Sequence, residues 1–234
     1  YTPLISIVVP TYNTDPVFFR EMLESVKCQT YPNWELILID DASPDKTVRT
    51  LSQEAAAEDS RVIHKALKKN RHIAGATNEG FAIAKGEYVS LLDHDDILHP
   101  SALFEIVKLL NENREIDVVY TDEDKIIDGK HRDPYLKPDW NPGLLWSTNY
   151  ITHFTTIRRS IVEKIGGERG EYNGAQDWDI ILRATYEAGV NHIHHIPKIL
   201  YSWRVHSDST AANLSAKPYV FEAQKKLLHD NLIA

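Results

Sequence analysis

Three carboxylates stand within four residues of this chain, at Asp93, Asp95 and Asp96, directly after the segment 87–92. That segment has the pattern of a short buried strand, so the acids should lie at the carboxyl end of a strand, where ligands bind in open α/β sheets. Neighbouring carboxylates repel one another unless a cation neutralises them, and oxygen ligands suit Mg²⁺ or Mn²⁺. The motif predicts a divalent-metal site open to substrate phosphates; the alternative is a solvated acidic turn.

Two other loops carry groups that suit a nucleotide. They are Pro-Thr-Tyr-Asn at 10–13 and Asp-Asp-Ala-Ser at 40–43, and each follows a predicted strand. The Tyr12 ring could stack on a base, while Asp40 and Asp41 could accept hydrogen bonds from a base imide or from ribose hydroxyls. For 40–43 alone, a turn and helix cap is the alternative. We expect these loops and the acidic turn to converge on one sheet edge, without the glycine-rich dinucleotide fingerprint or a Walker-type lysine loop.

The elements that must carry these loops alternate between strand and helix signals in the first half. Strand-like runs lie at 5–9, 34–39, 61–67, 87–92 and 117–121, and helical spacing at 16–26, 48–57, 77–84 and 100–110, with a loop at 70–75. This alternation predicts βαβ units and a mainly parallel sheet. Beyond about residue 121 the pattern loosens: we expect a hairpin turn at 128–129, strands at 151–157 and 192–204, and helices at 177–187 and 219–228. Both halves should share one sheet.

Composition restricts the class of protein. The chain has 234 residues, 42% hydrophobic and 26% charged, which is ordinary for a globular domain. Its net charge of −8 argues against a nucleic-acid partner. No apolar run approaches the ~20 residues of a membrane span, and no signal peptide opens the chain. We therefore expect a cytoplasmic location, with attachment to the inner face of the membrane as the alternative. The chain starts at Tyr1 rather than methionine, which suits a part of a longer protein with neighbouring domains.

The order and spacing of four motifs resemble the family 2 glycosyltransferases, which are inverting enzymes of the GT-A fold. The motifs lie at 10–13, 39–43, 70–80 and 86–96, and the likeness covers roughly residues 4–210. More distal segments, 120–125 and 137–141, are similar to bacterial enzymes that build polysaccharides, including rhamnan and O-antigen types. The resemblance implies an α/β, Rossmann-like GT-A fold in a single domain over 1–234. Residues 1–121 would form the nucleotide-binding half, and 122–234 the half that binds the acceptor and carries the base.

The same resemblance implies roles for individual residues around the donor. The nucleobase, ribose and donor sugar would be held by Pro10, Thr11, Tyr12, Asp40, Asp41, Asn78 and Asp93. Asp95 would contact Mn²⁺ or Mg²⁺ directly, and His206 in the segment Trp-Arg-Val-His would complete the metal site. Thr77 stands where the family often has arginine, so a charge contact expected there is missing.

Inverting transfer also needs a base, because the acceptor hydroxyl must lose its proton as it attacks the anomeric carbon. The family places an acidic pair at the start of a helix in its second half, and Gln176-Asp177 matches that site, with Asp177 as base. Gln176 replaces the more common glutamate. The alternative for Asp177 is helix capping, since the helix dipole favours an acid there. Trp178, next to the base, and Asp122 are candidates for acceptor contact.

These observations predict a metal-dependent, inverting transferase that moves a sugar from a UDP- or dTDP-linked donor to a glycan or lipid-linked glycan. Two rivals are a nucleotidyltransferase and a non-catalytic module that binds a nucleotide sugar or glycan. The first usually has a glycine-rich basic loop after its first strand, which residues 10–13 do not form. Asp95, Asp177 and His206 argue against the second, whereas Gln176 and Thr77 leave it open. Such a module would release no nucleoside diphosphate.

Overall fold

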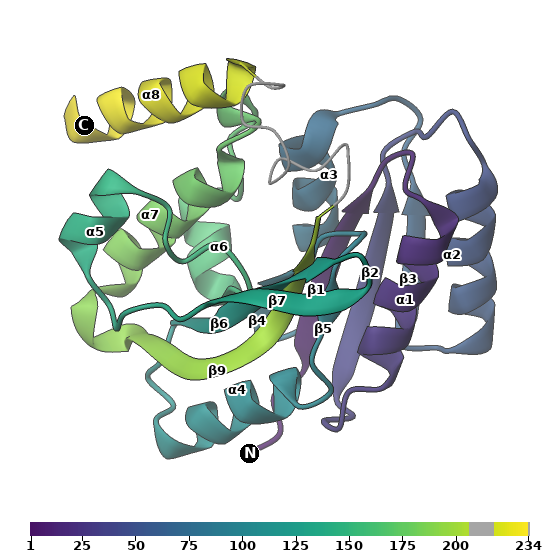
Figure 1. Cartoon of the computed structure of the whole chain (residues 1–234), viewed down its shortest axis with the longest axis horizontal. Helices are drawn as coiled ribbons and strands as arrows, with labels where there is room; N and C mark the ends of the chain where they lie inside the picture. Colours follow the sequence, from purple (N-terminus) through teal and green to yellow (C-terminus); the bar gives the residue numbers. More distant parts are fainter. Residues whose placement is uncertain (206–217, 234) are drawn as a thin grey trace.

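The protein, seen in a computed structural model, is described over residues 1–205 and 218–233. Its strands and helices alternate along the chain (Figure 1). The strands are β1 (Ile5–Thr11), β2 (Trp34–Asp40), β3 (Val62–Ala66), β4 (Tyr88–Leu91), β5 (Ile97–Leu98), β6 (Val118–Ile127), β7 (Lys130–Tyr135), β8 (Thr156–Arg158) and β9 (Ile193–Arg204). The helices are α1 (Pro16–Lys27), α2 (Thr47–Glu58), α3 (His72–Phe81), α4 (Ala102–Glu112), α5 (Pro142–Ser147), α6 (Arg159–Ile165), α7 (Gln176–Ala188) and α8 (Pro218–Ile233), with short 3-10 turns at Gly170–Tyr172 and Val190–His192.

One mixed sheet joins both halves of the chain. Its strands follow the order β3-β2-β1-β4-β8-β6-β9-β5, and β7 pairs with β6 outside this row. The pairs among β3, β2, β1 and β4 are parallel, whereas β8 runs antiparallel to both β4 and β6. The expectation that the two halves share a sheet is therefore confirmed. Strands β6 and β9 of the second half are also parallel, whereas β5, β7 and β8 pair antiparallel with their neighbours.

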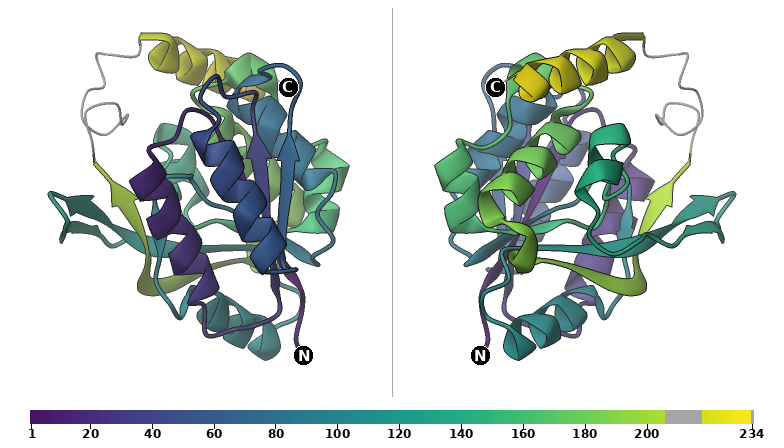
Figure 2. Two further views of the ribbon diagram at one scale, coloured as in Figure 1. Left: turned by 90° about the vertical axis from the view of Figure 1, so that its right-hand side faces the viewer. Right: turned by 90° about the vertical axis from the view of Figure 1, so that its left-hand side faces the viewer.

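Helices cover both faces of the sheet, and side-chain alternation along the strands assigns each face its own core. In β1, Ile5, Ile7 and Val9 pack in one cluster with residues of α1, α2 and α4. Val8 belongs to the opposite cluster, with residues of α3, α6 and α7. Successive side chains of a strand point to opposite faces, so a strand buried on both sides is apolar throughout. Figure 2 shows these layers from two sides.

The helix α1 begins where the sequence predicts. The Asp15 carboxylate accepts hydrogen bonds from the backbone N–H groups of Val17 and Phe18, and Pro16 occupies the first helical turn. Buried residues at 19, 22, 23 and 26 face the sheet. This cap ends the loop 11–15 at a fixed point beside the carboxyl end of β1.

The helix α3 starts five residues earlier than expected, so the predicted loop at 70–75 is wrong in part. The backbone N–H of Arg71 donates to Asp41 Oδ1 at 2.7 Å, and the N–H of His72 donates to Asn70 Oδ1 at 3.0 Å. These bonds fix the chain just before the helix, and Gly75 is accommodated inside it. Glycine is unfavourable in a helix interior, which explains why the pattern suggested a loop.

Other differences arise where long-range contacts replace local pattern. The two-residue strand β5 was not expected, and β6 extends six residues beyond the predicted 117–121. The predicted strand 151–157 is regular only over Thr156–Arg158, because side chains of the second half hold residues 151–153. The hairpin turn at 128–129 is confirmed by the pairing of β6 with β7, and this hairpin projects from the side of the molecule (Figure 2).

Candidate functional site

The three loops identified in the sequence leave the sheet at one edge. β1 lies between β2 and β4 and is parallel to both, with Thr11 opposite Asp40 and Val8 opposite Leu91. The N–H of Asp41 donates to the Thr11 carbonyl at 2.9 Å, and the N–H of Leu92 to the Val8 carbonyl at 3.2 Å. The expected convergence of these loops is therefore confirmed, and it occurs at the carboxyl ends of parallel strands, where ligands bind in α/β sheets.

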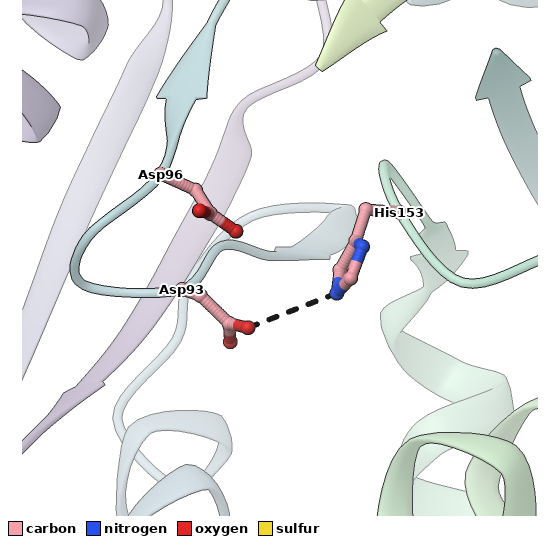
Figure 3. A group of neighbouring side chains, drawn as sticks. All are labelled: Asp93, Asp96 and His153. Atoms are coloured by element: carbon pink, nitrogen blue, oxygen red, sulfur yellow. Dashed lines mark ion pairs between the residues drawn. The ribbon is translucent and has the colours of Figure 1, made fainter. Parts of the chain in front are cut away.

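The acidic turn after β4 faces a histidine from the second half of the chain. Figure 3 shows Asp93, Asp96 and His153 pointing toward one another, and one ligand atom from each lies within 4.8 Å of the others. His153 Nε2 is 3.7 Å from Asp93 Oδ2. Burial, followed by the charges of Asp93 and Asp95, raises the pKa of Asp96 well above its ordinary value. The turn is thus a place where carboxylates repel one another.

Asp96 connects the acidic turn to β9 through hydrogen bonds. Its Oδ2 accepts a hydrogen bond from the Tyr201 hydroxyl at 2.5 Å, and its Oδ1 accepts one from the Arg204 N–H at 2.7 Å. Arg204 also donates through Nε to the Asp95 carbonyl at 2.8 Å and forms an ion pair with Glu21 at 2.5 Å. The end of β9 therefore fixes the turn that carries Asp93 and Asp95, and Arg204 serves this structural contact.

His153 lies between two carboxylates. Its ring stacks on Tyr201, with centroids 4.6 Å apart, and its Nδ1 is 3.3 Å from Glu123 Oε2. Burial disfavours the charged imidazole, but Glu123 and Asp93 outweigh this and raise the pKa of His153 to about 9. The ring therefore adds a positive charge to the site at neutral pH.

A buried ion pair fixes the loop that bears His153. Lys137 Nζ is 3.0 Å from Glu123 Oε2 and donates to the carbonyls of Ile151, at 2.6 Å, and His153. The same Glu123 oxygen accepts hydrogen bonds from the Thr152 hydroxyl at 2.8 Å and the His153 N–H at 3.1 Å. Glu123 lies on an irregular stretch of β6 where the register shifts, and such bulges redirect side chains beside functional sites.

Carboxylate oxygens of the kind that bind a hard divalent cation lie at this edge, although Asp95 is not in the cluster of Asp93, Asp96 and His153. Asp93 and Asp95 offer carboxylate oxygens on one turn, with 45% and 19% of their side chains exposed. A bound cation would relieve the repulsion between these two carboxylates. The expected histidine ligand, His206, lies outside the described residues.

The residues expected to hold the nucleotide differ in exposure. Tyr12 is 45% exposed beside the sheet edge, whereas Thr11 is buried and its hydroxyl donates to the Ile39 carbonyl. Asp40 is buried, accepting hydrogen bonds from the Ser43 N–H and Arg49 Nε. Asp41 is buried too and accepts the N–H of Arg71 at 2.7 Å. Pro10, at the end of β1, is half-buried. Of the five, Tyr12 presents the most accessible side-chain surface.

Asn78 joins α3 to the loop that follows α6. Its Nδ2 donates to the Glu168 carbonyl and its Oδ1 accepts the Glu168 N–H, both at 2.8 Å. Both ends of the amide are thus occupied by the backbone of one residue. The structure gives Asn78 a positioning role that its place in a donor-binding motif did not suggest.

Asp177 lies in the first turn of α7, as expected. Its Oδ2 accepts a hydrogen bond from Asn149 Nδ2 at 2.9 Å, which orients the carboxylate. Burial raises the pKa of Asp177, and the charge of Asp93 raises it further, while His153 and the Trp178 N–H lower it. A carboxylate with a raised pKa is a stronger general base. The charge of the acidic turn therefore acts on the expected base.

The two residues considered for acceptor contact are in fact packed inside. Trp178 is 5% exposed, belongs to the core and donates Nε1 to the Leu145 carbonyl at 2.9 Å. Asp122 is 3% exposed; its Oδ1 accepts the Lys137 N–H at 2.8 Å and lies 2.8 Å from His195 Nε2. Both side chains are thus engaged in packing and hydrogen bonds within the protein. An amphipathic helix pattern cannot distinguish a core indole from one that stacks on a sugar.

Sequence reasoning missed His153, Lys137 and Glu168. Each lies in the second half, where no strong periodicity marks a functional loop. Glu123 lies in the segment 120–125, but its partners are distant in sequence: Glu123 pairs with Lys137 and His153, and His153 pairs with Asp93. A lysine or histidine without a local motif offers no signal of this kind.

Known proteins are similar to this chain in sequence. The family model for glycosyl transferase family 2 matches residues 6–166. The uncharacterized protein y4gI of Sinorhizobium fredii is 45% identical over 231 residues, covering 98% of this chain and 25% of that protein. The O-antigen biosynthesis protein RfbC of Myxococcus xanthus is 37% identical, covering 98% of this chain and 18% of its own length. The chain thus spans a quarter or less of these relatives.

Two solved structures resemble the fold. S. aureus TarS 1-349 in complex with UDP has a TM-score of 0.75 at 20% identity, covering 96% of this chain and 64% of its own. The mannosyltransferase PcManGT from Pyrobaculum calidifontis, in complex with GDP-Man and Mn²⁺, has a TM-score of 0.66 at 21% identity, covering 91% and 60%. The expected α/β GT-A architecture, a curled and largely parallel sheet flanked by helices, is confirmed by these matches.

No helix among residues 1–205 and 218–233 combines the length and the apolar character that crossing a bilayer requires.

Proposed function

Because the chain belongs to glycosyl transferase family 2, we propose that it moves a sugar from a UDP- or dTDP-linked donor to a hydroxyl of a glycan or lipid-linked glycan. The O-antigen role in the name of RfbC and the UDP in the TarS complex support this proposal. The product would be a bacterial surface polysaccharide. Since the relatives are far longer, neighbouring domains would supply further parts of the reaction.

The donor would bind across the edge formed by β2, β1 and β4. The exposed ring of Tyr12 would stack on the base, and Asp93 would face the ribose or donor sugar. Asp95, with Asp93 beside it and His206 in addition, would hold Mn²⁺ or Mg²⁺. When bound, such an ion supplies positive charge to the departing diphosphate. The Mn²⁺ bound in the PcManGT complex supports this choice of metal class.

The chemical step would be a single displacement with inversion, and Asp177 would be its base. As the acceptor oxygen attacks the anomeric carbon, the Asp177 carboxylate takes the hydroxyl proton, and the bond from that carbon to the diphosphate oxygen breaks. Asn149 keeps the carboxylate oriented at 2.9 Å. The observation that supports this proposal is the carboxylate of Asp177 in the first turn of α7, which Asn149 holds at 2.9 Å and whose pKa burial and the charge of Asp93 raise.

The exchange Asp177→Asn tests the base. With UDP-glucose, UDP-N-acetylglucosamine and dTDP-rhamnose as donors, the variant should bind nucleotide as the wild type does, but release of nucleoside diphosphate on transfer to acceptor should fall by about 10²–10⁴-fold. Asp133→Asn, on the exposed hairpin strand β7, is the matched control and should keep full activity. Normal turnover by Asp177→Asn would refute the assignment.

The metal role is tested by thermal stabilisation, because a ligand that binds only the folded state raises Tm. We expect UDP or dTDP to stabilise the wild type with Mn²⁺ and to lose this effect with a chelator, while GDP serves as the mismatched base. Asp95→Ala should abolish the metal-dependent part. Unchanged metal dependence in that variant would contradict the proposed ligand.

A non-catalytic binding module is the second candidate. Gln176 favours it, because its Oε1 accepts the Gly174 N–H at 2.7 Å and so holds a turn rather than assisting a base. A module of this kind would bind UDP or dTDP but release no nucleoside diphosphate from any donor in the presence of acceptor. Product release by the wild type excludes it.

A further inference from the structure

Glu168 is a buried acid with an unused oxygen. It follows Gly166 and Gly167 at the end of α6 and is 6% exposed. Its Oε2 is buried and has no hydrogen-bond partner in the part of the chain that the structure describes, and no described cation pairs with it. A buried carboxyl oxygen without a partner is costly to the folded state, so the presence of this one needs an explanation other than stability.

Hydrogen bonds fix the backbone of Glu168, and they therefore fix the position of its side chain. The amide of Asn78 bonds both the N–H and the carbonyl of Glu168 at 2.8 Å. Gly167 has a φ of +73°, and a Cβ there would overlap Asn78 Oδ1. Only glycine allows this close approach of the loop to α3.

The surroundings of Glu168 connect it to the proposed reaction site. Burial, and then the charge of Asp177, raise the pKa of Glu168 to about 8, and Asp93 adds to the effect while the Thr77 side chain opposes it. Asp177 is the proposed base and Asp93 stands on the donor side. Glu168 lies in the segment between α6 and α7, whose first turn carries Asp177, and Asn78 ties it to α3. A carboxyl that holds its proton can both donate and accept a hydrogen bond.

Two other buried glutamates have hydrogen-bond or ion-pair partners. Glu35, also 6% exposed, accepts hydrogen bonds at Oε1 from the Ser6 hydroxyl at 2.5 Å and from the N–H groups of Lys85 and Gly86 at 2.6 and 3.2 Å. Glu123 is paired with Lys137. Among the described buried glutamates, Glu168 is the one with a buried, unpartnered oxygen, which points to a partner that arrives with the substrate. Asp124 Oδ1 is unpartnered too, but the other oxygen of Asp124 is 2.9 Å from His131 Nδ1.

We infer that Glu168 is a sugar-binding residue whose free oxygen receives a ring hydroxyl of the sugar that enters between Asp93 and Asp177. This inference rests on the proposed function. A ring hydroxyl donates one hydrogen bond and accepts others, so it matches a neutral carboxyl. The hydroxyl belongs either to the donor sugar or to the acceptor sugar, and the two sources differ in which binding step they affect.

The test compares Glu168→Met with Glu35→Met, two substitutions that replace equally buried carboxyls by an apolar chain. Glu168→Met should raise Tm by about 2–6 °C, because it removes an unsatisfied group, while Glu35→Met should lower it by leaving three donors unpaired. At the same time Glu168→Met should keep the UDP affinity of the wild type within about twofold and lose about 10- to 100-fold in kcat/KM for transfer. Gain of stability with loss of activity cannot come from misfolding.

The two sources are separated by calorimetry with UDP, UDP-glucose and UDP-N-acetylglucosamine in the presence of Mn²⁺. If the hydroxyl is the donor's, Glu168→Met weakens binding of the sugar nucleotide relative to UDP. If it is the acceptor's, donor binding and donor hydrolysis stay unchanged and the acceptor KM rises. Glu168→Gln, which keeps the shape and one hydrogen bond, should lie between the wild type and Glu168→Met in both readouts.

Two results would overturn the inference alone: unchanged kinetics in both arms, or a fall in Tm and in UDP affinity together, as expected for a structural residue. Failure of the wild type to bind any of the three nucleotides would instead overturn the proposed function and this inference with it. Because that failure appears in the unmodified protein and the others only in the variant, the two are distinguishable.

Discussion

Removing the charge of Glu123 should destabilise the protein far more than an ordinary ion-pair mutation. Glu123 and Lys137 have 7% and 0% of their side chains exposed, and their charged atoms are 3.0 Å apart. Glu123→Gln would leave the Lys137 ammonium buried without its counter-charge. Breaking a buried pair from one side costs about 3–5 kcal/mol.

The pKa of Glu123 gives a second route to this magnitude. Burial would raise it, but the hydrogen bond and charge of His153, followed by the charge of Lys137, lower it from 4.5 to about 2. That difference is equivalent to about 3 kcal/mol of stability in the ionised state. For a carboxyl whose folded pKa is lowered, this stability is present above pH 4.5 and is lost as the pH falls toward 2. Most of this effect comes from His153, while burial lowers the pKa of Lys137, so the pKa shift of Glu123 describes the whole cluster rather than this pair alone.

Thermal and urea unfolding of Glu123→Gln at pH 7 measure the effect, and Tm should fall by roughly 6–20 °C for a domain of this size. Glu79→Gln, which breaks partly exposed pairs with Lys65 and Arg71, is the control and should cost less than about 1 kcal/mol. The double variant Glu123→Gln/Lys137→Met should be more stable than the sum of the single losses predicts. A loss below about 1 kcal/mol in Glu123→Gln, or strictly additive losses, would refute this reasoning.

Three further outcomes are expected. Burial raises the pKa of Glu168 from 4.5 to about 8, so the stability that this group contributes is fully present below pH 4.5 and is lost as the pH rises to 8. Across that range, urea unfolding at several pH values should show wild-type stability declining by at most about 5 kcal/mol relative to Glu168→Gln. Asp179→Asn should cost about 3–5 kcal/mol in the same assay, because Arg169 and Arg183 both pair with this buried carboxylate. Tyr12→Ala should leave Tm unchanged and weaken UDP binding by about 5- to 100-fold in calorimetry, because an exposed ring is lost from the base-stacking surface.

The sequence predicts the first half of the fold well, because the information there is local. Apolar runs such as 5–9 and 34–39 are buried on both faces, and polar loops follow them, so strand order alone brings 10–13, 40–43 and 93–96 together. Asp15 and Pro16 define the start of α1 by their own chemistry. The acidic turn and Asp177 could likewise be found from motif and helix position.

The remaining parts of the site depend on contacts between residues far apart in sequence. Nothing local indicates that Glu123 would hold His153, or that Asn78 would hold the backbone of Glu168. The same limitation explains Trp178, whose helical spacing fits both a core side chain and an exposed one. Periodicity reports which face of an element is apolar, but it does not report what an opposite element brings to it.

The ties between Asp96 and β9 have a consequence for how the site is assembled during synthesis. Tyr201 and Arg204 reach Asp96 across 105 and 108 residues, and β9 is inserted in the sheet between β6 and β5. On a ribosome, the parallel unit of β1 to β4 can form early, but its acidic turn stays without these partners until β9 has left the exit tunnel. Long-range strand pairing is slow because loop closure precedes any gain in contacts. The nascent chain should therefore acquire an ordered acidic turn, and with it affinity for a divalent ion, as one of its last folding events.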